Sequence, residues 1–405
     1  MTVEKPPGDV FKAVKVTDSV YWVGAIDWGL QDFHGYLTGR GTTYNAYLIL
    51  ADKVTLIDTV KRPFKDEMLA RVASVVPPRR VDYIVSQHAE MDHTGALPEV
   101  MDAIAPERVF ASPKGAEALS DHFHLGGPVT PVADGEVLSL GNRSLTFLET
   151  PMLHWPDSMV SYLPEEHVLF SQDGFGMHLA SSERFDDELP ADVLAHEAAK
   201  YFANILLPFA PLVTKVLARV ADLGIDIRLI LPDHGPIWRR DVAGILDRWG
   251  QWAEQKPTRK AVVVYHTMWG STACMARAVA DGLAAGGATA CLMPLGSRHR
   301  SDIATALLNA GALLVGSPTM NNQIFPPVAD CLTYLKGLRP KNLVGAAFGS
   351  YGWSGEAVKR IEAELDAMKI ERVAEGVRVK YVPDDTALLA CRRLGETVAG
   401  KIVGS

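Results

Sequence analysis

One stretch, residues 86–95 with the sequence SQHAEMDHTG, constrains this chain more than any other part of it. It follows an apolar run at residues 81–85, whose β-branched and aromatic side chains are typical of a buried strand. The segment after it has the pattern of a helix start, and α/β sheets bind their ligands on such strand-to-helix loops. Four side chains of the loop can bind a metal: His88, Glu90, Asp92 and His93. Their alternating nitrogen and oxygen donors predict a metal centre with more than one ion.

Three later strands predicted from the sequence also end in a residue that can bind a metal. These strands cover residues 144–150, 167–173 and 227–234, and the residues at or just beyond their ends are His154, Asp173 and His234. A single histidine in such a place is more often structural, but four strand ends of this kind in one domain make that explanation improbable. Because strand ends at one edge of a layered α/β domain lie close together, we expect these side chains to converge.

The donor set contains four imidazoles and three carboxylates. One ion would leave several of these side chains unused, whereas two ions that share a bridging carboxylate would use them all. Zinc in a mononuclear hydrolase is held by three protein ligands and keeps an open water position. Imidazoles and hard oxygen donors without thiolate suit non-haem iron or manganese instead. The residue types therefore favour a centre of two redox-active ions.

The composition narrows the class of protein. A chain of 405 residues suggests two or three domains, and 48% hydrophobic with 22% charged residues is typical of a soluble globular protein. The net charge of -8 argues against a nucleic-acid partner. The N-terminus lacks a signal-peptide pattern, and we expect no membrane span, because no run approaches ~20 apolar residues. Four scattered cysteines, none at Cys-x-x-Cys spacing, exclude thiolate clusters and suit the cytoplasm.

The sequence predicts two domains, with the boundary after the last of the candidate metal ligands. Strand patterns fill residues 11–60, and an amphipathic helix is predicted at 64–76, where two prolines end it. Further on, the polar segment 253–260 contains a proline and lacks periodicity, which predicts a linker. We therefore assign 1–254 to a first domain, 255–260 to the linker and 261–405 to a second domain. The second domain alternates strands and helices, with its last strand at 377–382, which predicts a doubly wound five-stranded parallel sheet.

Three loops at predicted strand ends of the second domain could bind a flavin. The loop TMWGST at 267–272 offers hydroxyls and N–H groups at a helix N-terminus, which suits a phosphate, and it lacks the P-loop and dinucleotide glycine patterns. Aromatic side chains at 269, 351 and 353 could wall an isoalloxazine, although ordinary packing is an equal alternative for each tryptophan. The predicted contacts are Thr267, Met268, Trp269, Gly270, Ser271, Thr272, Pro318, Thr319, Met320, Asn321, Gly349, Ser350, Tyr351, Gly352 and Trp353.

These two patterns together resemble the flavodiiron proteins along essentially the whole chain. The order His88-x-Glu90-x-Asp92-His93, followed by His154, Asp173 and His234, is similar to their metallo-β-lactamase-like domain. Hydrolytic relatives of that fold usually have histidine where this chain has Glu90. The three loops of the second domain look like those of a flavodoxin that binds FMN. The resemblance implies an N-terminal metallo-β-lactamase-like αββα sandwich and a C-terminal flavodoxin-like, doubly wound sheet of five parallel strands.

The resemblance also implies roles for individual residues. It implies that one iron is held by His88, Glu90 and His154, that the other is held by Asp92, His93 and His234, and that Asp173 bridges them. The role of His93 is the least secure, because not every member uses this position as a ligand. The family further places His34 and Tyr201 near the open face of the diiron pair, as candidate catalytic groups. From the sequence alone these two could equally be a surface-loop residue and a helix-packing residue.

The function that the resemblance implies is reduction of O₂ to water, of NO to N₂O, or of both. FMN would relay electrons from a separate donor such as a rubredoxin, since no rubredoxin module with paired Cys-x-x-Cys follows residue 405, as in the minimal two-domain class. The family also implies a head-to-tail homodimer, or a dimer of dimers. Two alternatives remain: a zinc-dependent hydrolase with a flavodoxin appendage, and a non-enzymatic electron carrier or redox sensor. The sequence does not choose between O₂ and NO.

Overall fold

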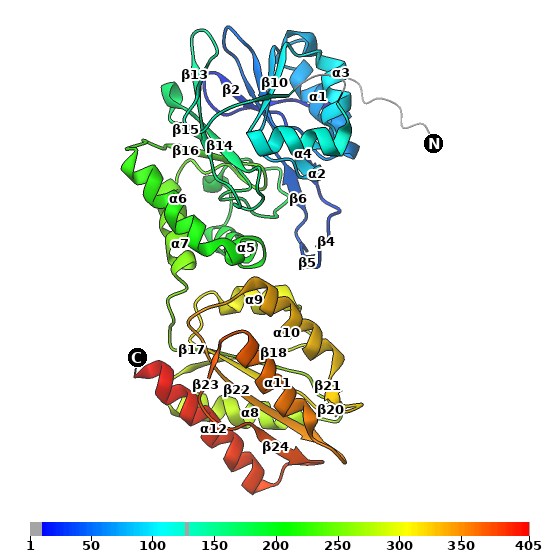
Figure 1. Cartoon of the computed structure of the whole chain (residues 1–405), viewed down its shortest axis with the longest axis vertical. Helices are drawn as coiled ribbons and strands as arrows, with labels where there is room; N and C mark the ends of the chain where they lie inside the picture. Colours follow the sequence, from blue (N-terminus) through cyan, green and yellow to red (C-terminus); the bar gives the residue numbers. More distant parts are fainter. Residues whose placement is uncertain (1–9, 126–128, 405) are drawn as a thin grey trace. The chain divides into compact units, whose positions relative to one another are not determined.

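The chain forms two compact units in the computed structural model, which describes residues 10–125 and 129–404. The first unit contains the chain up to His34, Thr38–Tyr201 and Pro211–Gly250. The second contains Gln251–Ser405 with two short segments, Gly35–Leu37 and Phe202–Ala210. Figure 1 labels the elements of both units.

The first unit is built on two sheets. In spatial order the larger sheet contains β1 (Val14–Lys15), β2 (Val20–Trp22), β7 (Tyr47–Ile49), β8 (Thr55–Ile57), β9 (Tyr83–Ser86), β10 (Arg108–Ala111) and β11 (Val129–Pro131). The smaller contains β12 (Val137–Ser139), β13 (Ser144–Glu149), β14 (Met159–Leu163), β15 (Val168–Gln172) and β16 (Leu229–Pro232). Short strands of this unit are β3 (Ala25–Asp27), β4 (Asp32–Phe33) and β6 (Thr42–Tyr44), of which β3 and β6 pair. Another short strand, β5 (Tyr36–Leu37), lies in the segment Gly35–Leu37 that is assigned to the second unit.

The two sheets face each other across a shared hydrophobic core. Trp22, Val85 and Phe110 of the larger sheet pack in one cluster with Phe147 and Phe170 of the smaller. The other face of the larger sheet packs against α1 (Lys65–Ala73), α3 (Leu97–Ile104) and α4 (Pro113–Phe123). Near the smaller sheet, Phe175 stacks on Trp249 of α7 (Val242–Glu254) with 4.1 Å between ring centroids. These layers confirm the predicted αββα sandwich.

The predicted helix at 64–76 is shorter than expected. A 3₁₀ turn covers Arg62–Phe64, and α1 ends at Ala73. Val75 and Val76 are β-branched, and Val76 precedes a proline, which disfavours helical backbone at the preceding residue. The helix therefore ends before the prolines.

One helical stretch of the described residues, Ala191–Asp222, is long and apolar enough by composition to cross a membrane. The expectation from the sequence, that no apolar run has membrane-spanning length, did not identify this stretch. The stretch comprises α5 (Ala191–Tyr201), a π-helical segment (Phe202–Leu206), a 3₁₀ turn (Leu207–Phe209) and α6 (Ala210–Asp222). Of the apolar window, 44% is buried within the protein, and core helices of soluble proteins pass the same test. A single stretch of this kind is weak evidence for a membrane span.

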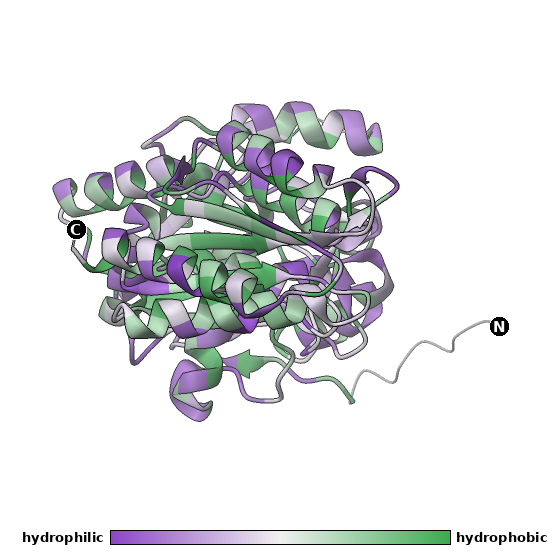
Figure 2. Ribbon diagram, turned by 90° about the horizontal axis from the view of Figure 1, so that it is seen from below, coloured by the Kyte–Doolittle hydropathy of each residue, from purple (hydrophilic) through white to green (hydrophobic). Residues whose placement is uncertain are grey.

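The second unit is a parallel sheet between helices. Its strands are β17 (Lys260–Tyr265), β18 (Thr289–Pro294), β19 (Ala312–Gly316), β22 (Val344–Tyr351), β23 (Glu371–Arg372) and β24 (Val377–Lys380), with a two-stranded ladder of β20 (Thr319–Met320) and β21 (Gln323–Ile324). Its helices are α8 (Ser271–Ala285), α9 (Arg300–Leu307), α10 (Pro326–Leu338), α11 (Glu356–Ala367) and α12 (Asp385–Val403). In Figure 2 the hydrophobic strands lie between helices with hydrophilic outer faces.

The strand order of this sheet is β18-β17-β19-β22, followed by β23 and β24, all in parallel register. This is the flavodoxin-like order 2-1-3-4-5, in which the chain reverses its direction of progress between the first and third strands. The predicted fifth strand is split, because β23 and β24 pair with the two ends of β22. Gly376 lies at the break, where a Cβ would come within 2.3 Å of Val358.

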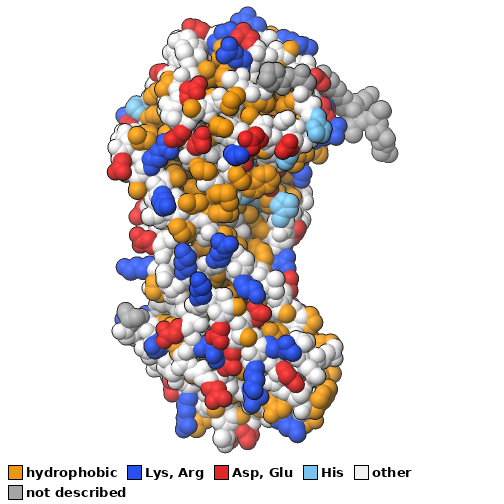
Figure 3. All heavy atoms as spheres, viewed as in Figure 1, with side chains coloured by type: hydrophobic (Ala, Val, Ile, Leu, Met, Phe, Trp, Pro, Cys, Tyr) orange, Lys and Arg blue, Asp and Glu red, His pale blue; other side chains and the backbone are white. Residues whose placement is uncertain are grey.

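The surface carries charges of both signs. Figure 3 shows acidic and basic side chains interspersed over the visible face, and neither sign covers a broad area of it. The net charge of -8 is therefore not gathered into one patch on that face.

Candidate metal centre and flavin site

The motif loop after β9 is held in place by buried hydrogen bonds. The Asp58 carboxylate accepts from the Gln87 backbone N–H at 2.7 Å and from its side-chain amide at 3.0 Å. The Thr94 hydroxyl donates to the carbonyls of Ala89 and Glu90 at 2.9 and 2.8 Å. The short helix α2 (Met91–Thr94) follows at once. The loop thus turns within a few residues while its side chains remain directed into the protein.

The structure brings all seven predicted ligands together. They follow β9, β13, β15 and β16, and β13, β15 and β16 run in the same direction, so their ends lie at one edge of the smaller sheet. Two groups have ligand atoms within 4.8 Å of one another and could each hold an ion: His88, Glu90, His154 and Asp173, and Asp92, His93 and His234. His154 is partly exposed, and the others are at most 8% exposed.

Asp173 joins the two groups, because its two oxygens face different histidines. Its Oδ2 lies 2.8 Å from His154 Nε2 and 3.4 Å from His88 Nε2. Its Oδ1 lies 3.2 Å from His93 Nε2 and 3.3 Å from His234 Nε2. This is the arrangement that a bridging carboxylate requires.

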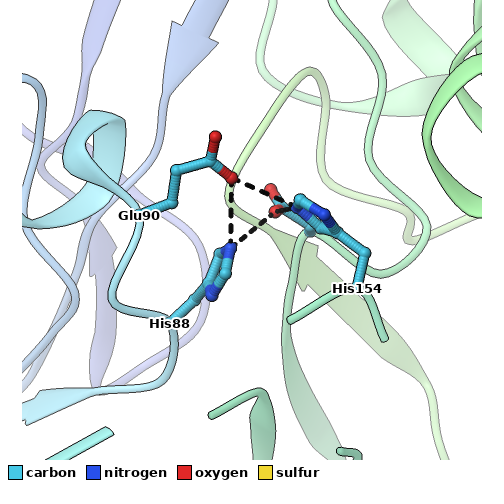
Figure 4. A group of neighbouring side chains, drawn as sticks. His88, Glu90 and His154 are labelled. Atoms are coloured by element: carbon cyan, nitrogen blue, oxygen red, sulfur yellow. Dashed lines mark hydrogen bonds and ion pairs between the residues drawn. The ribbon is translucent and has the colours of Figure 1, made fainter. Parts of the chain in front are cut away.

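Glu90 completes the first group. Figure 4 shows His88 and Glu90, from the same loop, and His154, from another segment, pointing toward one another. One carboxylate oxygen, Glu90 Oε2, lies 3.3 Å from Nε2 of both His88 and His154. All three side chains therefore present an electron-pair donor to the same small volume.

Opposite charges compensate one another in this buried cluster. Burial lowers the pKa of His88, but hydrogen bonds to Asp157 and Glu90 outweigh it and raise that pKa to about 10. Burial acts against His93 too, and Asp92 and Asp173 raise its pKa well above the usual range. Burial raises the pKa of Asp173, but His93 and His154 hold it well below its ordinary value. The cluster thus requires positive charge, which metal cations can supply in place of protons.

The chemistry of the donors fits two hard metal ions. Both carboxylate oxygens of Asp92, both ring nitrogens of His93 and Oδ1 of Asp173 are buried without a hydrogen-bond partner among the described residues. Buried polar atoms of this kind normally have partners, so their lack of them calls for an explanation. The atoms that converge on the cluster are placed as ligands of an ion would be, since they lie 3.2–3.3 Å apart without hydrogen-bond geometry.

The two predicted catalytic candidates both lie near this cluster. His34 Nε2 is 3.5 Å from Glu90 Oε1, and its side chain is 76% exposed. It lines a cavity of about 400 Å³ with Leu30, Phe33, Met91 and Asp92, among others. Tyr201 is buried at the end of α5. Burial and the nearby carboxylates, Asp173 first, raise the pKa of its hydroxyl well above the usual range. The structure thus places both beside the proposed ligands.

Two residues that the sequence did not single out belong to the same region. His178 is buried, with its ring centroid 4.8 Å from that of His234 and 5.1 Å from that of Tyr201. Asp157 is buried against His88. His178 follows Asp173 by five positions in a segment without periodicity, so no local pattern marks it. Asp157 follows His154 by three positions, which is a weak signal at best.

A second cavity, of about 460 Å³, lies at the C-terminal ends of β17, β19 and β22. It is lined by the predicted residues Met268, Trp269, Ser271, Pro318, Thr319, Met320, Asn321, Ser350, Tyr351, Gly352 and Trp353, and also by Tyr381 and Val382, which the sequence had not indicated. In α/β sheets, ligands usually bind at the C-terminal ends of the strands, at the point where the strand order reverses.

Four predicted flavin residues do not line this cavity and instead shape its loops. The Thr267 hydroxyl accepts from the Gly270 N–H at 3.0 Å, and the hydroxyls of Thr272 and Ser350 are 2.9 Å apart. Gly349 approaches Ser317 so closely that a Cβ would lie 2.2 Å from its carbonyl oxygen.

The tryptophans at this cavity are not packing residues. Trp269 is 94% exposed and Trp353 is 86% exposed. Large exposed aromatic side chains beside a concave site are suited to stacking on a planar ligand. Of the two explanations for these residues, the geometry favours flavin walls.

Comparisons with known proteins agree with both sites. A family model described as ODP family beta lactamase matches residues 42–235, and the flavodoxin model matches residues 263–395. The chain is 48% identical to the nitric oxide reductase of Moorella thermoacetica, over 96% of this chain and 98% of that protein. It is 46% identical to the rubredoxin-oxygen oxidoreductase of Megalodesulfovibrio gigas, with the same coverage.

Solved structures give the same answer. The rubredoxin oxygen:oxidoreductase from the anaerobe Desulfovibrio gigas matches with a TM-score of 0.95, covering 97% of this chain and 99% of that one at 46% identity. The flavodiiron protein from Giardia intestinalis matches with a TM-score of 0.92 at 35% identity, covering 97% of each chain. The predicted fold, the FMN domain and the diiron domain are thereby confirmed. This chain belongs to the flavodiiron protein family, and it is an oxidoreductase whose cofactors are FMN and a non-haem diiron centre.

Proposed function

We propose that this protein reduces O₂ to water, NO to N₂O, or both, at its diiron centre, with FMN relaying the electrons. The observation that carries the proposal is the position of Asp173, whose two oxygens face the two histidine groups. Two redox-active ions that share this carboxylate could together supply two electrons to one diatomic molecule, whereas hydrolysis needs no change of oxidation state. The relatives that are named for NO and for O₂ support both substrates.

The ligand assignment is part of the proposal. One iron would be held by His88, Glu90 and His154 and the other by Asp92, His93 and His234, and Asp173 could contribute one oxygen to each. The contacts of His93 support its inclusion, since its Nε2 is 3.3 Å from Asp92 Oδ1 and 3.2 Å from Asp173 Oδ1. Its complete burial leaves solvent no access to compete for that nitrogen.

The residues around the centre suit a small neutral substrate. When bound, the iron pair supplies two electrons and open coordination positions, and FMN passes electrons to it singly. Apolar side chains, including Leu30, Phe33 and Met91, line the cavity at the cluster and admit a diatomic without binding it. His34 is exposed there and can carry protons in from solvent. Tyr201, buried among carboxylates, keeps its proton and can donate a hydrogen bond.

FMN needs a source of electrons. We propose a separate donor protein of the rubredoxin type, which the name of the Megalodesulfovibrio gigas relative supports. A cytoplasmic location fits the four free cysteines. The nearly fully exposed Trp269 and Trp353 at the flavin cavity are suited to being covered by another protein surface. We propose that this surface belongs to a second copy of the chain, in a head-to-tail homodimer in which the FMN of each subunit serves the irons of the other.

Anaerobic reduction followed by parallel turnover with O₂ and with NO tests the activity. Rapid reoxidation of the reduced flavin by at least one of them is expected, with iron as the metal found on analysis. Slow reoxidation by both would refute the proposal. A zinc content of two ions per chain would instead favour the alternative of a zinc-dependent hydrolase.

Complementation tests the dimer. Asp173→Asn removes the bridging carboxylate, and Ser271→Glu places a negative charge at the predicted phosphate loop. Neither variant alone should turn over. If the variants are unfolded and refolded together, about half of the dimers are mixed, and each contains one intact FMN–iron pair, so about a quarter of wild-type activity should return. No recovery in a mixture of confirmed heterodimers would show that electrons pass within one chain.

A further inference from the structure

Three histidines of the metal cluster each have an oxygen group beside the ring nitrogen that points away from the cluster. These three groups differ in chemical type. His88, His93 and His234 all direct Nε2 into the cluster. Each directs Nδ1 outward to a different group. For His88 the group is the Asp157 carboxylate, for His93 the Asp233 carboxylate, and for His234 the backbone carbonyl of Thr43. The outer group is therefore a carboxyl side chain for one histidine of each proposed iron and a backbone carbonyl for the third.

We propose that Asp157 and Asp233 are positioning residues, each of which fixes one histidine ligand of a different iron. Loss of either carboxylate would weaken the binding of one iron and spare the other. The inference rests on the ligand grouping of the proposed function. Its physical basis is that an acceptor on the outer ring nitrogen fixes the tautomer and the ring orientation, and a carboxylate also makes the inner nitrogen a stronger donor.

Asp157 makes the closer contacts of the two. It is 3% exposed, and its Oδ2 lies 3.2 Å from His88 Nδ1 and 2.6 Å from the backbone N–H of Ala89. Its own carbonyl accepts from the Ser112 hydroxyl at 2.6 Å. Ser112 in turn caps α4 by accepting from the Gly115 N–H at 2.9 Å. A side chain fixed at both ends in this way holds the His88 ring in one orientation.

Asp233 makes a looser contact from a more enclosed place. It is fully buried, and its Oδ2 lies 3.4 Å from His93 Nδ1. Its backbone is held on both sides, because its N–H donates to the Gln172 carbonyl at 2.8 Å and its carbonyl accepts from Asn45 N–H at 2.7 Å. Neither carboxylate oxygen has a hydrogen bond from any residue in the part of the chain that the structure describes. This contact with His93 is longer than the 3.2 Å contact of Asp157 with His88, so we expect a smaller effect here than at Asp157.

The test is iron binding by each variant, measured without turnover. Asp157→Ala should weaken one of the two irons by about 10- to 100-fold and leave the second near wild-type affinity. Mössbauer spectra of protein loaded with ⁵⁷Fe should then show one of two quadrupole doublets lost at limiting iron. Asp233→Ala should remove the other doublet, with a smaller loss of affinity.

Two further variants separate charge and folding from positioning. Asp157→Asn can keep both hydrogen bonds, because His88 and Ala89 donate to the same oxygen, so it should retain the iron more tightly than Asp157→Ala. Asp186 is a matched control: it is 5% exposed and accepts from the backbone N–H groups of residues 239–241, remote from the histidines. Asp186→Asn should leave both doublets unchanged if the proposal holds.

Three results would overturn the inference. They are equal loss of both irons in Asp157→Ala, unchanged iron affinity in both alanine variants, and a loss in Asp186→Asn like that in Asp157→Ala. A failure of the proposed function appears differently. In that case wild-type protein would bind two irons and show both doublets, yet reoxidise slowly with O₂ and with NO.

Discussion

The metal centre and the flavin site solve the problem of holding a cofactor in opposite ways. Six of the seven proposed metal ligands are at most 8% exposed, and buried charges on histidines and carboxylates determine their positions. The flavin cavity is instead open, with Trp269 and Trp353 almost fully exposed at its edge. One site is assembled by the interior of its domain, and the other is a set of loops at the end of a finished sheet.

The difference follows from the chemistry of the two cofactors. Buried charges cost several kcal/mol each unless they are compensated, so the metal ligands must meet one another whether or not an ion is present. A flavin brings its own large apolar surface, so its site needs only an open slot and polar groups at the edges. Substitutions at the two sites should therefore have different effects. Those at the metal centre should change both stability and metal binding, and those at the flavin walls should change flavin binding alone.

The largest effect is expected from Asp173→Asn. The amide cannot offer two anionic oxygens to the two histidine groups, so iron content should fall below one per chain and turnover should drop about 100-fold or more. FMN content should stay at the wild-type level, because the flavin cavity contains no residue of the metal cluster. Metal analysis, flavin absorbance and turnover on one preparation measure all three. A variant that kept both irons would contradict the bridging role.

Gly349→Ala should test whether part of the flavin site depends on packing. An alanine Cβ would lie 2.2 Å from the Ser317 carbonyl, so β19 and β22 must separate, and the free energy of unfolding should fall by about 1–3 kcal/mol. Gly337→Ala is the matched control, because a Cβ there meets nothing within 4 Å on α10 and should raise stability by up to about 1 kcal/mol. Urea unfolding of flavin-free protein gives both values. Equal effects in the two variants would show that the close contact is unimportant.

Trp269→Ala and Trp353→Ala should each weaken FMN binding by about 10-fold, since stacking on an aromatic wall is worth about 0.5–1.5 kcal/mol beyond buried area. Because the side chains are 94% and 86% exposed, the unfolding free energy of the flavin-free protein should not change. Fluorescence titration with FMN measures the affinity, and iron content serves as the internal control. A destabilised flavin-free variant would mean that these residues are packed after all.

The smallest effect is expected at Glu166, a partly buried charge outside both sites. Burial raises the pKa of Glu166, but the hydroxyls of Ser19 and Thr17 and the guanidinium of Arg143 outweigh it and lower that pKa. A carboxyl with a lowered pKa stabilises the fold above its unfolded-state pKa, and that contribution is lost as the pH falls through the folded-state value. Glu166→Gln should therefore reduce stability by about 1 kcal/mol at pH 7, and the difference should begin to shrink near the ordinary carboxyl pKa of about 4.3 and vanish below the lowered folded-state value. A difference that persisted in acid would assign the effect to packing.

The sequence predicted the metal ligands because each lies at a strand end, where local pattern alone indicates position. His88, His154, Asp173 and His234 could all be recognised before any contact was known, and the tertiary structure brought them within one cluster. The three flavin loops were recognisable for the same reason. Asp157, Asp233 and Tyr381 were not, because an isolated acid or aromatic residue has no spacing that distinguishes it from a surface side chain.

By itself, the sequence determined that both domains are α/β and which types of donor lie at each site, since periodicity and strand-end chemistry are local properties of the chain. The αββα sandwich of the first domain was predicted from the family resemblance. Only the tertiary structure decided which oxygen of Asp173 faces which histidine, which acceptors lie behind the rings, and that the flavin tryptophans are exposed rather than packed. These depend on contacts between segments far apart in the chain. Burial and pairing of charges are set by such contacts, and no local pattern records them.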